Sequence, residues 1–177
     1  MTRISAGIAC AFAISALADQ TGKPTAEVGA KATQAVKEVF PDAQIGKIGT
    51  ENEDGMNLVE VKFTVNGVKK EADVSMDGVL LEVEEKGEIA KLPESAAQAL
   101  KKATQGMKAK YEIATTYAKQ QKDASGTMTV TKLAQPTVAY EADVKNGDKK
   151  GEFVVDANGK ILESPKWAES SEKEEKD

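Results

Sequence analysis

Acidic side chains are the residues of this chain whose types and spacing most readily suggest chemistry. Two carboxyl groups that stand about 5 to 10 Å apart can catalyse the hydrolysis of a glycosidic bond. Several carboxylates grouped together can instead bind a cation. Lysines are interleaved with the acids, however, and like charges on a strand edge also protect it from aggregation. We therefore favour solvated strand edges over either kind of site for the acidic set Glu51, Glu53, Asp54, Glu82, Glu84, Glu85 and Glu88.

A second acidic motif, Asp156-Ala157-Asn158-Gly159, has the opening of a calcium-binding loop. An EF-hand loop continues to a bidentate Glu at its twelfth position, which is Trp167 in this chain. Asn and Gly are also the residues that a tight turn between two strands requires. The motif therefore predicts a turn, and we assign no metal ligands from the sequence.

Composition argues against several classes of function. The 177 residues include no histidine, which removes the usual general base and the commonest metal ligand, and the one cysteine is Cys10. The net charge is −5 and the lysines are scattered, so the clustered basic surface of a nucleic-acid-binding protein is not expected. We predict a protein that is not an enzyme, with no catalytic residues, no cofactor and no nucleic-acid partner.

Aromatic and loop residues are the best candidates for contact with a partner protein. Tyr and Trp dominate the binding energy of interfaces, and loops on a rigid scaffold carry specificity. Two tyrosines share one face of a predicted strand, and a polar segment at about 118–137 is longer than the fold requires. Buried tyrosines and a hairpin without a partner are the alternatives. The predicted partner-binding residues are Tyr111, Tyr117, Lys119, Lys122, Met128 and Trp167.

The elements that must position these residues are predicted from apolar periodicity. Helices are expected after Pro24 and after Pro93, with Val36 and Leu100 on their apolar stripes. Elsewhere apolar and polar residues alternate, as in Val59 to Val65, and Asn-Gly or Asp-Gly turns separate the runs. This pattern predicts an α+β fold of two tandem units, each with one helix packed on an antiparallel meander of about four strands.

The first eighteen residues, MTRISAGIACAFAISALA, are predicted to be an export signal. Arg3 supplies the positive charge, Ile4 to Ala16 form an apolar run too short to span a bilayer, and Ala-Leu-Ala provides a cleavage site before Asp19. A lipoprotein signal ending at Cys10 would leave almost no apolar run, so we favour plain cleavage. The mature protein is expected in the periplasm or outside the cell, with no membrane anchor after cleavage. The acidic residues 166–177 are expected to be disordered.

The sequence between these ends contains two similar halves. Gln34-Ala35-Val36-Lys37 corresponds to Gln98-Ala99-Leu100-Lys101, and Gly78-Val79-Leu80-Leu81-Glu82 corresponds to Gly159-Lys160-Ile161-Leu162-Glu163. The offset grows along the chain, which indicates about sixteen inserted residues in the second copy. We place the first repeat at 24–91 and the second at 92–165, with the insertion at about 118–137.

These segments resemble the PepSY-like family, whose paired domains are related in architecture to β-lactamase-inhibitor proteins. The resemblance rests on Phe40-Pro41-Asp42-Ala43 and on the segments 35–48 and 140–163, whereas Thr104-Gln105-Gly106-Met107 departs from the Phe-Pro motif. It implies an exported binding module that inhibits or restrains a peptidase or another envelope or extracellular protein. A periplasmic sensor that binds a metal or small ligand through acidic turns is the alternative.

Overall fold

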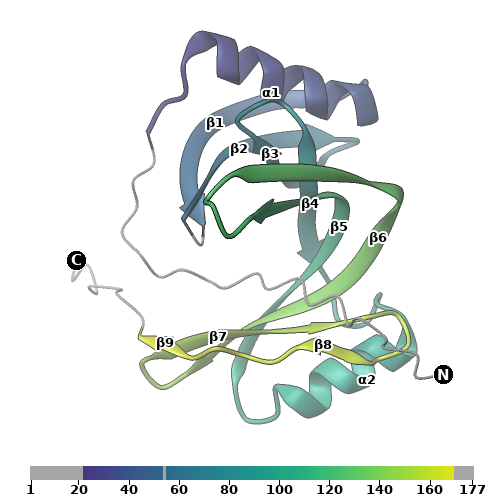
Figure 1. Ribbon diagram of the computed structural model, residues 1–177. Helices are drawn as coiled ribbons and strands as arrows, with labels where there is room; N and C mark the ends of the chain where they lie inside the picture. The colour runs from purple at the N-terminus through teal and green to yellow at the C-terminus, as the bar shows by residue number, and fades with distance from the viewer. Residues whose placement is uncertain (1–21, 54, 170–177) are drawn as a thin grey trace, which may run out of the picture.

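Residues 22–53 and 55–169 are described by a computed structural model, in which nine strands form one antiparallel sheet (Figure 1). Strands β1 to β8 are neighbours in chain order, and β9 pairs with β7. One helix followed by four strands occurs twice, before β9 ends the described chain. The bounds are α1 Ala26–Val39, β1 Gln44–Glu53, β2 Met56–Val65, β3 Val68–Ser75, β4 Leu80–Gly87, α2 Glu94–Ala103, β5 Lys108–Lys122, β6 Met128–Asn146, β7 Lys149–Val155, β8 Ile161–Glu163 and β9 Ala168–Glu169.

The predicted division into two tandem helix-on-meander units is wrong, because the sheet is continuous. β4 pairs with β5 from Glu82↔Thr116 to Gly87↔Tyr111, so the two halves of the chain are hydrogen-bonded to each other. An unpaired strand edge exposes main-chain donors and acceptors, and this pairing satisfies two such edges at once. Alternation of apolar and polar residues is the same for an edge strand and an interior strand, so it could not reveal the junction. The protein is dominated by this one sheet.

The two helices lie at opposite ends of the molecule, on the outer side of the curved sheet (Figure 1). Thr25 caps α1, since its Oγ1 atom accepts a hydrogen bond from the N–H of Val28, and α2 begins directly after Pro93. Val36 and Leu100 have no exposed surface, so the predicted apolar stripes are confirmed. Each helix therefore covers its own core. The strand residues buried beneath α1 include Val59, Val61 and Phe63, and those beneath α2 include Ala142, Val144 and Val155.

We call the face of the sheet that neither α1 nor α2 covers the inner face. Val59 and Val61 are buried under α1, so the alternate residues Glu60 and Lys62 must lie on the opposite side. Directly paired residues on neighbouring strands share a face of the sheet. The register therefore shows which residues of each strand lie on the inner face. The inner-face residues include Glu60, Lys62, Glu71, Asp73, Glu82, Glu84, Lys86, Lys108, Lys110, Glu112, Glu141, Asp143, Lys145, Lys150, Glu152 and Glu163.

The inserted segment of the second half is a long hairpin, whereas the sequence predicted a polar loop at its start. Residues 119–122 pair with residues 128–131, which extends β5 and β6 as regular strands. Asp123 closes the turn, because its Oδ1 atom accepts a hydrogen bond of 2.8 Å from the N–H of Ser125. Val130 then packs on a small apolar cluster, so the hairpin is held against β2 and β4; the cluster is Leu58, Leu81 and Ala118.

The ends of the chain were predicted to be a removed signal and a disordered tail. The predicted signal, residues 1–18, lies outside the described residues. Ala168–Glu169 form β9 against β7, although they fall within the segment 166–177 that was expected to be disordered, and residues 170–177 are not described. No helix within 22–53 and 55–169 is long and apolar enough to cross a membrane.

Candidate functional site

Five carboxyl groups from four neighbouring strands gather at the centre of the inner face. Carboxyl oxygens of Glu84 on β4, Glu112 on β5 and Glu141 on β6 all lie within 4.8 Å of one another. Glu82 on β4 and Glu152 on β7 belong to the same group, because the negative charge of each acts on Glu84. We call these five residues the carboxyl cluster.

The strand register is what brings the carboxyl cluster together. Glu112 and Glu141 are directly opposite each other on β5 and β6, and Lys86 on β4 faces Glu112 from the other side. Glu152 is diagonal to Glu141, because it pairs with Asp143. Inner-facing positions of four strands thus coincide, although the residues are far apart in the sequence.

Two members of the carboxyl cluster are almost completely buried. Glu82 is 3% exposed and Glu141 is 5% exposed. The Glu82 carboxyl accepts a hydrogen bond of 2.6 Å from the Oγ1 of Thr116, and the Glu141 carboxyl is hydrogen-bonded to Glu152. The interpretation of the acidic run as solvated strand edge is therefore wrong for Glu82. β4 is an interior strand and not an edge, and the inner-face side chains on the neighbouring strands cover the Glu82 carboxyl.

Burial is the main reason why the carboxyl cluster resists ionisation. It raises the pKa of Glu84 to about 9, and the negative charges of Glu82 and Asp73 add to this shift. Burial also raises the pKa of Glu141, and the neighbouring Glu152 raises it further. The pKa values of the remaining members, Glu82, Glu112 and Glu152, are raised first by burial as well. A positive charge placed on the cluster would favour the ionised carboxylates and release protons.

The excess of acid continues onto the first half of the inner face. Lys62 on β2 lies between two carboxylates, with its Nζ atom 3.3 Å from Glu60 and 3.0 Å from Glu71. Burial nevertheless raises the pKa of Glu60, and a hydrogen bond with Glu71 adds to the rise. One lysine therefore does not neutralise this part of the face.

A cavity of about 410 Å³ opens beside the carboxyl cluster. Glu84 and Glu112 line it, together with Lys62, Glu71 and Lys86 of the inner face. Its volume lies in the range of sites that enclose a small ligand. The cavity could therefore receive a side chain of a partner next to the carboxyl groups.

The geometry of the carboxyl cluster suits binding better than hydrolysis. The two carboxyl groups of a glycoside hydrolase stand about 5 Å or more apart, so that the reacting bond fits between them. Oxygens of Glu84, Glu112 and Glu141 lie within 4.8 Å, and the Glu141–Glu152 hydrogen bond closes one gap entirely. This spacing instead suits a cationic group that several oxygens contact at once.

The predicted tyrosine patch is divided between two cores on the outer side of the sheet. Tyr111 packs against the cluster under α2, where its hydroxyl lies 3.4 Å from the Oγ1 of Thr104. Tyr117 packs against the cluster under α1, and burial raises its pKa. The structure therefore does not bring the two tyrosines together, and it places neither beside the carboxyl cluster.

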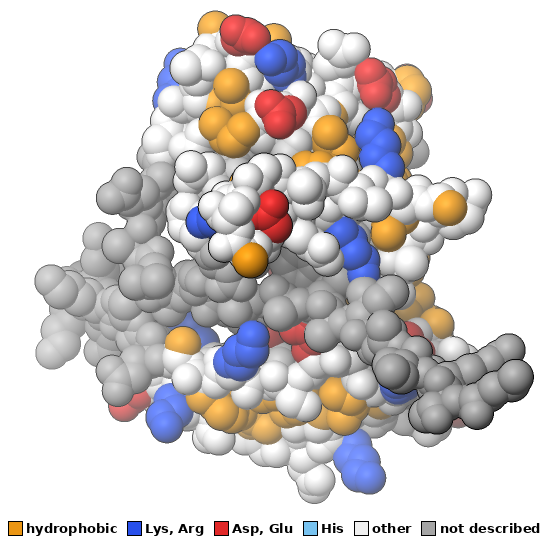
Figure 2. Space-filling view, in the orientation of Figure 1, with side chains coloured by type: hydrophobic (Ala, Val, Ile, Leu, Met, Phe, Trp, Pro, Cys, Tyr) orange, Lys and Arg blue, Asp and Glu red, His pale blue; other side chains and the backbone are white. Residues whose placement is uncertain are grey.

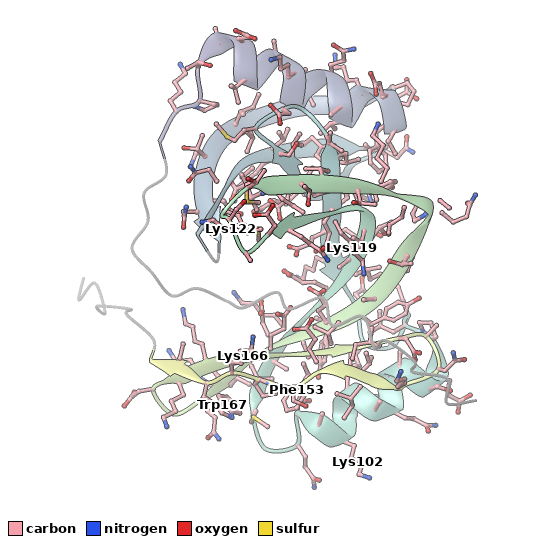
Figure 3. All side chains as sticks on the ribbon, viewed as in Figure 1. Lys102, Lys119, Lys122, Phe153, Lys166 and Trp167 are labelled. Carbon is pink, nitrogen blue, oxygen red and sulfur yellow. The ribbon has the colours of Figure 1, made fainter. Side chains whose placement is uncertain are left out.

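The other predicted contact residues lie in two separate places. Lys119 and Lys122 are on the β5–β6 hairpin, and Trp167 is at the far end of the molecule beside β7 (Figure 3). Met128 on the hairpin and Trp167 are 38% and 40% exposed. Hydrophobic side chains form a band over the end of the molecule that holds β7, β8 and α2 (Figure 2). Contact of these residues with a partner stays a prediction.

Asp156 serves the turn that the sequence predicted. Its Oδ1 atom accepts hydrogen bonds of 2.9 Å from the N–H groups of Asn158 and Lys160, between β7 and β8. Gly159 has a φ of +78°, which a side chain would disfavour. The motif is therefore explained by local structure.

Comparison with known proteins adds the fold relatives of the chain. No protein-family profile and no curated protein sequence matches it. A BLIP-like protein from Bacteroides fragilis is 16% identical with a TM-score of 0.53, and the match covers 81% of this chain and 89% of that one. A protein from Bacteroides eggerthii, provisionally described as periplasmic, is 13% identical with a TM-score of 0.52 over 82% and 89% of the two chains.

A DUF2874 family protein from Bacteroides uniformis is similar as well, at 12% identity and a TM-score of 0.51 over 76% of this chain and 86% of that one. Identity at this level shows the fold alone. The PepSY-like resemblance stays a prediction. The chain has a BLIP-like fold.

Proposed function

We propose that the protein is a non-enzymatic binding module that holds a positively charged segment of an exported partner protein on the inner face of its sheet. One fold relative is described as BLIP-like, which supports a binding role, and another is provisionally described as periplasmic, which supports an exported location. Restraint of a peptidase or another envelope protein would follow if the bound segment were part of that partner's active surface.

The observation that carries this proposal is the carboxyl cluster. Burying several like charges side by side costs folding free energy, and the surroundings of Glu84 oppose its ionisation, since burial raises its pKa to about 9. A Lys or Arg side chain from a partner would remove that opposition through charge-assisted hydrogen bonds. Binding can therefore recover free energy that the free protein cannot.

The inner face is also rigid enough to act as a binding surface. Neighbouring strands are paired on both sides of Glu84, Glu112 and Glu141, so their main chain does not need to be ordered when a partner arrives. Pre-organisation of this kind lowers the entropy cost of association. The β5–β6 hairpin, with Lys119, Lys122 and Met128, extends from the same strands and could provide further contacts to the partner.

A divalent cation is the alternative occupant of the carboxyl cluster. Three carboxyl oxygens within 4.8 Å of one another, from Glu84, Glu112 and Glu141, are ligands of the type that Ca²⁺ prefers. A calcium sensor would fill this place with the ion alone. A peptide-binding module would fill it with a partner's ammonium or guanidinium group.

A binding titration with defined peptides tests the proposal. The full chain should bind a short lysine-rich peptide and not a glutamate-rich peptide of equal length, and binding should weaken as salt is added. The Glu84→Gln/Glu112→Gln variant should lose most of this affinity. The matched control is Glu27→Gln/Glu38→Gln, which makes the same two substitutions on the exposed surface of α1. Equal affinity of the two variants would refute a role for the cluster.

Calcium and magnesium titrations separate the two occupants. If the natural occupant of the carboxyl cluster is a cationic segment of a partner and not calcium, millimolar Ca²⁺ should raise the melting temperature of the protein no more than millimolar Mg²⁺ does. A calcium-specific rise that disappears in Glu84→Gln/Glu112→Gln would favour the sensor, because an ion that binds only the folded form must stabilise it.

A further inference from the structure

A second cavity lies on the inner face, at the end of the sheet where β5 begins and the β6–β7 turn lies. Its volume is about 420 Å³. The charged side chains that line it are Lys108, Lys110, Asp143, Lys145 and Lys150. Four lysines and one aspartate carry a net charge of +3 when all are ionised. In a chain whose net charge is −5, this is a local reversal of sign. We call it the lysine cavity.

The strand register places three of these lysines in one row. Lys108 on β5 is directly opposite Lys145 on β6, and Lys145 is directly opposite Lys150 on β7. Side chains paired in this way start about 5 Å apart, and like charges directly opposite each other destabilise a sheet. The next row, Lys110 with Asp143 and Glu152, is mixed in charge. The concentration of positive charge is therefore confined to the row at the end.

Asp143 is the one acidic residue among those that line the lysine cavity. Burial raises its pKa, and the charges of Lys110 and Lys150 act in the opposite direction. An anion in the lysine cavity would be attracted by the same lysine side chains that act on Asp143.

Main chain of β5, β6 and β7 forms the floor of the lysine cavity, and none of the described residues of this floor has a bulky side chain pointing into it. Ala109, Val144 and Gly151 line the floor, and their outer-facing positions direct any side chain away from the cavity. A Cβ atom at Gly151 would stand 2.5 Å from Pro165 and 3.1 Å from the ring of Trp167. The indole of Trp167 therefore supports the floor from the opposite side of the sheet.

We propose that the lysine cavity binds a ligand with two or more closely spaced oxyanions, such as a pyrophosphate group or a dicarboxylate. Lysine ammonium groups contact such oxygens as point charges, and a row spaced at about 5 Å can engage neighbouring anionic groups at the same time. This site is distinct from the carboxyl cluster, and its ligand has the opposite charge. A failure of the anion-binding proposal would therefore leave the proposed function untouched, and the reverse is also true.

Titration of the full chain with inorganic pyrophosphate at constant ionic strength tests the site. Calorimetry should detect saturable binding. Trp167, the one tryptophan of the chain, should report it by a change in fluorescence because it lies beneath the cavity. The Lys108→Gln/Lys145→Gln variant should bind about tenfold more weakly or worse, since hydrogen bonds to charged groups are lost. The Lys101→Gln/Lys102→Gln variant removes the same charge from exposed positions of α2 and should bind as the wild type does.

A charge-preserving variant and a second anion complete the test. Lys108→Arg/Lys145→Arg should retain binding, which separates lost charge from a damaged fold. Succinate at the same ionic strength distinguishes the two sources of oxyanion, because tighter binding of pyrophosphate indicates a phosphate ligand and tighter binding of succinate a dicarboxylate. No saturable binding of either anion, or equal loss in the Lys108/Lys145 and Lys101/Lys102 glutamine variants, would overturn the proposal.

Discussion

Glu141 on β6 and Glu152 on β7 are hydrogen-bonded to each other through their carboxyl groups, on the face of the sheet that neither α1 nor α2 covers. Such a contact needs a proton on one of the two groups, because two carboxylates offer only acceptors. Protonation, stability and the capacity to receive a cationic ligand are therefore linked in this molecule.

Stability should fall as pH rises from about 5 to about 9. In the unfolded chain the glutamates titrate near 4.5, whereas the folded chain keeps a proton on Glu84 up to a pKa of about 9. Between these values the folded state binds more protons than the unfolded state. The free energy of unfolding then decreases by up to about 1.4 kcal/mol per pH unit for each such group. Urea midpoints at pH 5, 7 and 9 measure the slope, and a flat or rising series would contradict the assignment.

The substitution Glu141→Gln should stabilise the protein at pH 8 while weakening its binding to a lysine-rich peptide. A neutral amide keeps a hydrogen bond to Glu152 and removes a buried group that resists ionisation, so a gain of about 1 kcal/mol is expected. The same change deletes one of the carboxylates that a cation would contact. Parallel urea unfolding and peptide titration are the measurements. The exposed Glu94→Gln in α2 is the control: it should leave peptide binding unchanged and should lower stability by less than about 1 kcal/mol, because Glu94 lies in the first turn of the helix.

A substitution that leaves a cavity in the core under α1 should also lower the stability of the second half of the sheet. Val36 is fully buried under α1, and Val36→Ala should cost about 2 kcal/mol. Because β4 and β5 are paired, we expect one cooperative transition, so the fluorescence of Trp167 should shift its urea midpoint together with the far-ultraviolet circular dichroism. Two separate midpoints would show that the halves unfold independently in spite of the shared sheet.

The turn at Gly159 should tolerate alanine less well than the turn at Gly106. Both residues have a positive φ, of +78° and +80°, which costs a side chain about 1 kcal/mol. A Cβ at Gly159 would also stand 2.5 Å from the main-chain oxygen of Ser95 in α2, whereas nothing lies within 4 Å of one at Gly106. Melting temperatures of Gly159→Ala and Gly106→Ala compare the two. Equal losses would mean that α2 does not rest on this turn.

The individual elements could be predicted because their signals are local. The three- and four-residue steps that include Val36 and Leu100 correctly marked the buried sides of two helices. The alternation at Val59, Val61 and Phe63 correctly marked a strand with one buried face. Each of these patterns depends on residues within one turn of a helix or a few positions of a strand.

The sheet junction and the carboxyl cluster could not be predicted, because both depend on the pairing of distant strands. Glu84, Glu112 and Glu141 come together only once β4, β5 and β6 are aligned, and nothing in any one strand specifies that register. A signal was present all the same. Acids recur at every second position in Glu82 and Glu84, and again in Glu141 and Asp143, opposite the apolar face of each strand. We interpreted Glu82 and Glu84 as facing solvent and drew no inference from Glu141 and Asp143, whereas the curved sheet brings all four to its inner face.

The β4–β5 pairing has a consequence for how the chain could be divided. The connection between Gly87 and Leu92 follows the pairing Gly87↔Tyr111 and precedes α2. A break introduced there would leave two fragments. One would carry β4 and the other β5, each with unpaired main-chain N–H and C=O groups along one edge. Such fragments should reassemble on mixing, so this connection is a natural place for new termini in a circularly permuted or split version of the protein.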